Sequence, residues 1–244
     1  MNVVYDTIYK WSDTMKKKKW CHFRHKIWFS LMRPIFKVLL KVKYNYKAKP
    51  FKVRKQNYLV ISNHTCTLDP FLICASIKKP VYFIASDDIM KNGFVSRFIG
   101  HAVAPIPIRK GSMDIGCIKK SISVAKEGGT IGLFPEGNRT YSGELGNIDI
   151  SLIKFIRMLK IPLLIYYIDG GYGMDPRWGK KSRYSSGAVG SVKKEISVEE
   201  ISKLSDEELM KIIKENLSQN YNHNLTFKCF NNCTIYINTN YIIL

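Results

Sequence analysis

The sequence predicts a single α/β domain with a mostly parallel sheet flanked by helices, preceded by an N-terminal amphipathic helical segment. From residue 57 onward, short runs of β-branched and aromatic residues alternate with apolar residues at helical spacing. The 244 residues are 45% hydrophobic and show neither internal repeats nor an internal linker, so they suffice for one buried core. We therefore divide the chain into a basic segment (1–47), a folded domain (48–217) and a tail (218–244).

Residues 22–47 are expected to form the amphipathic segment, with a kink or restart at Pro34. Side chains of two kinds recur every three or four positions on different faces: the apolar Trp28, Leu31, Ile35, Leu39 and Val42, and the basic Lys26, Arg33, Lys37 and Lys41. The segment is either a surface helix packed on its own domain or an interfacial helix lying on anionic lipid. Its charges interrupt it too often for a bilayer span.

Strands are expected where β-branched and aromatic residues cluster, at 58–62, 81–85, 102–108, 130–134 and 163–168, with a further strand at 187–196. Helices are expected between them at 114–127, ended by Gly128 and Gly129, and at 147–160. Their expected inward faces are Ile115, Ile118, Ile122 and Ala125 in the first, and Leu152, Phe155, Ile156 and Leu159 in the second. A capping box at 205–208 predicts a last helix that buries Leu209, Ile212, Ile213 and Leu217.

Charge and cysteine usage narrow the possible partners and setting. Lys and Arg number 39 against 19 Asp and Glu, and this net charge of +20 favours nucleic acid, anionic lipid or phosphorylated substrates. No cleaved secretory signal is expected, because the apolar stretch contains Arg33, Pro34 and Lys37 and lacks a small-residue cleavage site. The six cysteines have no framework spacing, which predicts reduced thiols in a cytosolic setting.

The Asn-rich tail carries the weakest signals. His223, Cys229 and Cys233 would supply three soft ligands but no second Cys pair, so we predict no metal site. Two β-prone pieces, 234–237 and 241–244, flank a polar break and form either a frayed end or an added edge strand.

Reactive side chains follow the first of the predicted strands. His64 comes directly after that strand, and Asp69 lies five residues later, where the next helix begins. The carboxylate could hold one ring nitrogen and raise the basicity of the other, which a general base requires. A helix-capping aspartate beside an unrelated histidine gives the same pattern.

Two further loops at strand ends carry charge. Pro135 and Gly137 predict a turn after 130–134, with Glu136 and Arg139 on it. The arginine could bind phosphate oxygens, while the glutamate accepts from a substrate hydroxyl, or the two form a structural ion pair. The loop 106–111 adds the cations Arg109 and Lys110, unless these are simply solvated.

In this order and separation, Asn63-His64-x4-Asp69, the basic loop and Phe134-Pro135-Glu136-Gly137-x-Arg139 closely resemble motifs of the glycerolipid acyltransferases, specifically the 1-acylglycerol-3-phosphate (lysophosphatidate) acyltransferase group. The resemblance covers roughly residues 25–217 and includes 161–163 as a fourth block. It implies His64 as general base, Asp69 as its orienting carboxylate, and a glycerol phosphate site formed by Arg109, Glu136, Gly137 and Arg139. Pro107 and Ile108 depart from the aromatic residue that usually precedes the cation of the second block.

The resemblance implies transfer of a fatty acyl group from a thioester, acyl coenzyme A or acyl carrier protein, to the free hydroxyl of lysophosphatidate in phospholipid synthesis. No cofactor or metal is expected. The expected partners are a lysophospholipid, the thioester donor and an anionic membrane surface, and not nucleic acid. The expected location is the cytoplasmic face of the cell membrane, as a peripheral or monotopic protein.

Other readings of the chain stay open at this point. The acceptor could be glycerol 3-phosphate or another lysophospholipid, or the chain could be a non-catalytic basic module that binds membrane or RNA. A serine hydrolase is disfavoured because no Gly-x-Ser-x-Gly motif is present. Cys66 is expected to be a packing thiol and not a nucleophile.

Overall fold

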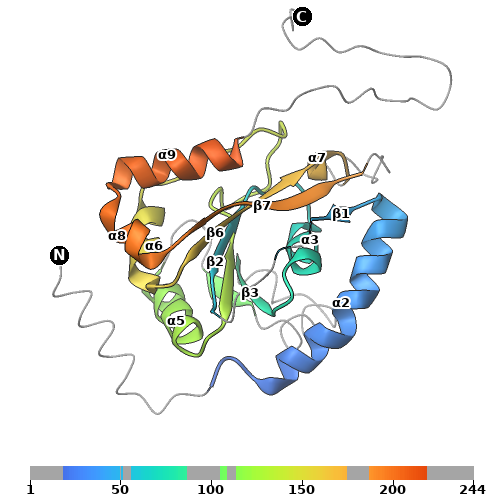
Figure 1. Ribbon diagram of the computed structural model, residues 1–244, viewed down its shortest axis with the longest axis horizontal. Helices are drawn as coiled ribbons and strands as arrows, with labels where there is room; N and C mark the ends of the chain where they lie inside the picture. Colours follow the sequence, from blue (N-terminus) through green and yellow to red (C-terminus); the bar gives the residue numbers. More distant parts are fainter. Residues whose placement is uncertain are drawn as a thin grey trace, which may run out of the picture.

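The computed structural model describes residues 19–49, 51, 56–86, 105–108, 114–174 and 187–218. In this part of the chain, seven strands form one sheet that lies between two layers of helices (Figure 1). The strands are β1 (Lys47–Ala48), β2 (Leu59–Ser62), β3 (Val81–Ser86), β4 (Ile106–Ile108), β5 (Thr130–Leu133), β6 (Leu163–Asp169) and β7 (Val189–Ile196). The mostly parallel α/β sheet that the sequence predicts is confirmed.

The order across the sheet is β1-β7-β6-β2-β5-β3-β4. All neighbouring strands run parallel except β6 and β7, which are antiparallel. The central strands β2 and β5 are buried along their whole length, as expected for a parallel sheet covered on both faces. Of the strand expected at 102–108, residues 106–108 form β4, and 102–104 lie outside the described residues.

The helices are α2 (Phe23–Tyr44), α3 (Asp69–Ser76), α5 (Ile115–Lys126), α6 (Ser151–Leu159), α7 (Gly171–Met174), α8 (Val198–Lys203) and α9 (Asp206–Leu217). One face of the sheet packs on α5, α6 and α9, and the other packs on α2 and α3 (Figure 1). The inward stripes expected for α6 and α9 are confirmed. In α5 the expected face is partly wrong: Ile115 is exposed, because the helix turns Cys117, Ser121 and Val124 toward the sheet.

Helix α2 continues through Pro34, so the expected restart does not occur. The contacts on its inner side explain why the helix holds there: Arg33 donates to the carbonyl oxygens of Cys74 and Ala75 at the end of α3, at 3.2 and 2.8 Å, and Phe36 packs on Phe71. The predicted apolar stripe of α2 is exposed along the helix. The helix therefore does not pack on its own domain through that stripe.

Among the described residues the four cysteines Cys21, Cys66, Cys74 and Cys117 form no disulfide, in line with the predicted reduced thiols. The tail from residue 219, with its expected β-prone pieces and its His223, Cys229 and Cys233, lies outside the described residues. The division of the chain at residues 47 and 217 stays a prediction. In the described ranges, no helix is long and apolar enough to cross a membrane.

Candidate active site

The arrangement of β2, β5 and β6 brings three loops to one edge of the sheet. Strand β2 lies between the other two and pairs with both in parallel. The register joins Ile61 to Leu133 and Ser62 to Tyr166, so the loops after β2 and β5 begin side by side. In open α/β sheets, ligands bind outside the carboxyl ends of the strands, where these loops lie.

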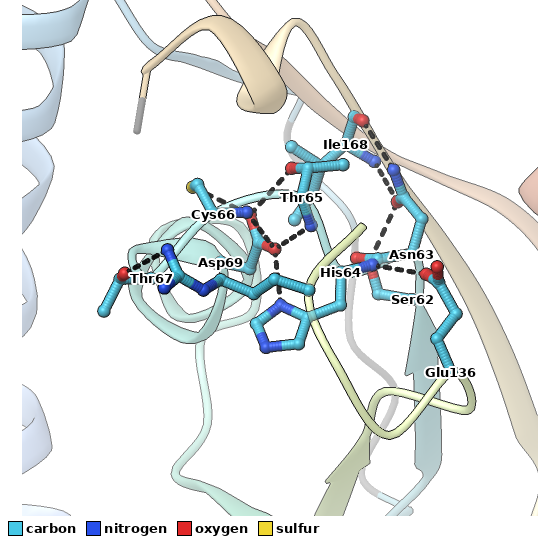
Figure 2. Close-up of polar contacts among 10 residues, drawn as sticks. Ser62, Asn63, His64, Thr65, Cys66, Thr67, Asp69, Glu136 and Ile168 are labelled. Atoms are coloured by element: carbon cyan, nitrogen blue, oxygen red, sulfur yellow. Dashed lines mark hydrogen bonds and ion pairs between the residues drawn. The ribbon is translucent and has the colours of Figure 1, made fainter. Parts of the chain in front are cut away.

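His64 and Asp69 contact each other in the loop that leads from β2 into α3. Nδ1 of His64 lies 2.8 Å from Oδ2 of Asp69, the first residue of α3 (Figure 2). Because an ionised carboxylate only accepts hydrogen bonds, Nδ1 carries the hydrogen and Nε2 is left as the basic nitrogen. None of the described residues hydrogen-bonds Nε2. The histidine side chain is 19% exposed, which leaves this nitrogen room to meet a substrate.

The Asp69 carboxylate is fully buried, yet both of its oxygens are satisfied. Oδ2 also accepts from the backbone N–H groups of Thr65 and Cys66, at 2.6 and 2.9 Å. Oδ1 accepts from the Thr65 hydroxyl at 3.2 Å and from the Cys66 thiol at 3.0 Å (Figure 2). These donors stabilise the ionised form and hold it in one orientation. Cys66 is buried, as the expected packing thiol would be, and the structure adds its hydrogen bond to Asp69.

The His64 ring stacks on one aromatic side chain. It stacks on Phe134, with ring centroids 4.1 Å apart and planes at 17°. Phe134 stacks in turn on Phe83 of β3, with centroids 5.7 Å apart. The ring plane of the histidine is therefore fixed by the residue that directly follows β5.

The neighbouring strand β6 holds the start of the same loop. The Asn63 side chain donates to the Ile168 carbonyl oxygen and accepts from the Ile168 N–H, both at 2.9 Å (Figure 2). Gly171, just after β6, leaves space for Thr65, since a Cβ there would lie 2.3 Å from the threonine hydroxyl oxygen. These contacts position the backbone on both sides of His64.

The residues expected to bind glycerol phosphate divide into two groups. Glu136, Gly137 and Arg139 lie in the turn after β5, and Glu136 lies beside His64 (Figure 2). Arg109 lies outside the described residues. Arg139 donates to the Thr67 hydroxyl at 2.9 Å, which brings a cation to the loop between His64 and Asp69. Gly137 has a φ of +67°, a left-handed conformation that favours glycine.

Both Glu136 oxygens contact backbone N–H groups. Oε1 accepts from His64 N–H and Oε2 from Gly146 N–H, each at 2.8 Å. Burial raises the pKa of Glu136, and these two hydrogen bonds act in the opposite direction. The ion pair with Arg139 that the sequence left open is not among its contacts in the described part of the chain.

Sequence reasoning missed several residues that shape this site. The motif points to Phe134 only as one of its members. An aromatic residue directly after a central strand is nevertheless a usable signal for a ring at the carboxyl edge of the sheet. Thr65 and Cys66 gave no signal, because their contacts with Asp69 depend on how the loop folds back. Among the described residues, no group of three or more His, Cys, Asp or Glu side chains could hold a metal ion.

The chain is similar in sequence to several known proteins. The sequence model of the family described as Acyltransferase matches residues 42–168. The chain is 28% identical over 137 residues to the chloroplastic 1-acyl-sn-glycerol-3-phosphate acyltransferase LPAT1 of Arabidopsis thaliana, covering 54% of this chain and 36% of that one. It is 26% identical over 117 residues to the 1-acyl-sn-glycerol-3-phosphate acyltransferase of Borreliella burgdorferi, covering 45% and 46%. In both matches the alignment spans less than half of the relative's length.

A solved structure shares the fold. The crystal structure of the 1-acyl-sn-glycerophosphate (LPA) acyltransferase PlsC from Thermotoga maritima matches with a TM-score of 0.63 and 19% identity. The match covers 88% of this chain and 86% of that one. Nearly the whole chain, including the α/β sheet, therefore has a counterpart of known structure.

Proposed function

Because this chain belongs to the acyltransferase family, we propose that it transfers a fatty acyl group from a thioester to the free hydroxyl of lysophosphatidate, yielding phosphatidate for phospholipid synthesis. The observation that carries the proposal is the 2.8 Å contact between His64 Nδ1 and Asp69 Oδ2, which leaves Nε2 as the base at the carboxyl edge of the sheet. The relatives are named 1-acyl-sn-glycerol-3-phosphate acyltransferases, which supports this choice of acceptor.

The proposed mechanism is direct acyl transfer. Nε2 of His64 removes the proton of the acceptor hydroxyl as its oxygen attacks the thioester carbonyl carbon. Asp69 stabilises the imidazolium that forms. The tetrahedral intermediate then collapses, the C–S bond breaks, and the departing thiolate takes the proton from His64. The products are one ester and one thiol, and no covalent acyl-enzyme is needed.

The acceptor's phosphate is proposed to bind at the turn after β5. Arg139 offers a planar guanidinium that suits phosphate oxygens. Its hydrogen bond to Thr67 holds it next to the loop that carries His64. Gly137, in the same turn, has no side chain that would keep a phosphate from approaching the backbone. We propose Arg109, which directly follows β4 in the sequence, as a second cation for the phosphate. Glu136 lies on the same turn, with its carboxylate accepting two backbone N–H groups.

The donor is proposed to be acyl coenzyme A or acyl carrier protein, and both are anionic partners that suit a chain of net charge +20. We propose that the reaction needs no cofactor or metal beyond this co-substrate, because His64 and Asp69 supply the proton transfer. The two donors differ in size and chemistry, so parallel assays with each distinguish them.

We propose that α2 docks the chain on an anionic membrane surface, on the cytoplasmic face of the cell membrane, as a peripheral or monotopic protein. The support is the exposed apolar stripe of α2, whose lysines Lys26, Lys37 and Lys41 are also exposed. Such a helix buries its apolar face among lipid headgroups while its cations meet the surface potential. The opposite side of α2 packs on α3, so docking would hold the active site close to its lipid substrate.

An acceptor panel tests the function directly. The purified chain is assayed for thiol release with lysophosphatidate, glycerol 3-phosphate and other lysophospholipids, each with both thioester donors. We expect the highest kcat/KM with lysophosphatidate. Preference for glycerol 3-phosphate or another lysolipid would reassign the acceptor within the family. Lack of thiol release with every pair would favour a non-catalytic binding module.

A further inference from the structure

The turn after β5 hydrogen-bonds to both the N–H and the carbonyl group of His64. His64 N–H donates to Glu136 Oε1 at 2.8 Å, and the His64 carbonyl oxygen accepts from Thr140 N–H at 2.9 Å. The same turn begins with Phe134, on which the histidine ring stacks. Three residues within a seven-residue stretch therefore hold the backbone and the ring of the proposed base.

Of these three residues, Glu136 is the one with a charged side chain. Its carboxylate is half-buried, which is unfavourable for a charge unless strong hydrogen bonds compensate. Both compensating donors are backbone N–H groups, from His64 and Gly146. Gly146 permits the second contact, because a Cβ at that position would lie 3.0 Å from Oε2.

The direction of these contacts decides between two roles for the glutamate. A carboxylate that accepts from a substrate hydroxyl needs an oxygen turned toward the substrate. Here one oxygen is turned to His64 N–H, as Figure 2 shows, and the other to Gly146 N–H. Hydrogen bonds to an ionised acceptor are about twice as strong as neutral ones, so they resist exchange for a substrate contact.

We propose that Glu136 is a positioning residue that acts through His64, fixing its backbone so that Nε2 meets the acceptor hydroxyl. This inference rests on the proposed function, because it assigns His64 as the base. Asp69 fixes one ring nitrogen, Phe134 fixes the ring plane, and Glu136 fixes the main chain from which the ring extends. Displacing a reacting group by about 1 Å can cost on the order of a hundredfold in rate, so a backbone anchor affects kcat.

The first test is Glu136→Gln, with Glu144→Gln as the matched control. The glutamine has a single carbonyl oxygen, so it must present its NH₂ group to either His64 N–H or Gly146 N–H and lose that contact. Glu144 is an exposed acid on the same connection, where the same substitution should leave turnover unchanged. We expect Glu136→Gln to lower kcat by about tenfold to a hundredfold, with the KM for lysophosphatidate within about twofold of wild type. A raised KM with unchanged kcat would overturn the inference.

Gly146→Ala provides a second route that keeps the glutamate and its charge. The added methyl group would lie 3.0 Å from Oε2, so the carboxylate must shift by a few tenths of an ångström, which disturbs its alignment with the backbone of His64. We expect the same pattern as in Glu136→Gln, a lower kcat at nearly constant KM. A wild-type kcat in this variant would contradict the positioning role. Thermal unfolding of each variant checks that the fold is retained.

A spectroscopic readout does not depend on activity. The chain has five histidines, so selective ¹⁵N-histidine labelling gives a simple amide spectrum, and His64→Asn identifies the His64 peak by its loss. We expect the His64 amide proton to move upfield and to exchange about tenfold faster or more in Glu136→Gln, and to stay in place in Glu144→Gln. Because the glutamine oxygen could stay on His64 N–H, Glu136→Ala, which removes both acceptors, completes the test. An unmoved His64 peak in both variants would overturn the inference even if the wild type acylates no acceptor, whereas an inactive wild type contradicts only the proposed function.

Discussion

Nδ1 of His64 lies 2.8 Å from Oδ2 of Asp69, and the same oxygen accepts two backbone N–H groups from the loop between them. The loop therefore folds around the buried carboxylate, and the partly exposed histidine ring hydrogen-bonds to it through Nδ1. This relationship makes the aspartate both the organiser of the loop and the partner of the proposed base. Changes at the two residues should consequently differ in their effects.

His64→Ala should lower kcat by about a hundredfold to ten thousandfold, because it removes the group that accepts the hydroxyl proton. The fold should persist, since the side chain is partly exposed and lies at the edge of the sheet. Thiol release from acyl coenzyme A with lysophosphatidate measures the loss. Wild-type turnover in this variant would contradict the assignment of the base.

Asp69→Asn should lower kcat by a comparable factor and should also lower stability. The asparagine side chain can present its oxygen to only part of the donors that now satisfy the buried carboxylate, and an unpaired buried donor costs about 1 to 3 kcal/mol. Urea unfolding of Asp69→Asn and His64→Ala separates the two effects. Equal stability of the two variants would show that the loop does not depend on the carboxylate.

The membrane role of α2 can be tested with Leu31→Glu combined with Val38→Glu. Leu31 belongs to the apolar stripe, and Val38 is a further exposed apolar residue seven positions later on the same helix. Each contributes about 1.5 to 3 kcal/mol when fully buried, so vesicle affinity should fall by about a hundredfold or more. Flotation with vesicles of anionic phospholipid measures the loss. Ile150→Glu is the matched control, because Ile150 is an exposed apolar residue at the start of α6. Undiminished flotation of the double variant would place the membrane contact elsewhere.

Arg33 should contribute to stability even though it belongs to the basic set of the amphipathic helix. Its guanidinium donates to two carbonyl oxygens in the last turn of α3, where helix carbonyls lack partners within the helix. Arg33→Ala should therefore lower the free energy of unfolding by about 1 to 3 kcal/mol. Urea denaturation measures the change, with the exposed Lys37→Ala on the same helix as control. Equal midpoints for the two variants would rule out a bracing role.

Three thiols should react slowly with iodoacetamide at pH 8 in the folded chain. Burial raises the pKa of Cys21 and Cys117 to about 11 and that of Cys74 to about 12, above the ordinary thiol pKa of 9.0. At pH 8 only about a thousandth or less of each is thiolate, the reactive form. Because folding favours the neutral thiols, the stability they contribute is complete below about pH 9 and is lost as the pH rises through 11 to 12.

Mass spectrometry after alkylation measures these rates, with glutathione as the reference thiol. Labelling should accelerate about tenfold for each pH unit from 8 to 10, and strongly on addition of urea. Labelling of Cys74 as fast as glutathione at pH 8 in the folded chain would contradict its raised pKa.

Local patterns of the chain were enough for most of the fold. The strands near residues 59, 81, 130, 163 and 189 were predictable because central strands consist of short β-branched runs. By contrast, β1 has two residues and exists only through its pairing with β7, which no local propensity encodes. Helix α8 was also missed, although Ser197 and Glu200 form a capping box that the sequence displays.

The candidate residues for the chemistry can be picked out from the sequence alone, because the spacing of His64 to Asp69 and the turn around Glu136 are local features. Only the tertiary structure decided how these residues are used. The adjacency of β2 and β5 places Phe134 on the His64 ring and turns Glu136 to the His64 backbone. The packing of α2 on α3 leaves the apolar stripe of α2 exposed. Such contacts join segments distant in the chain, so they depend on strand order and helix packing, which no local stretch of residues specifies.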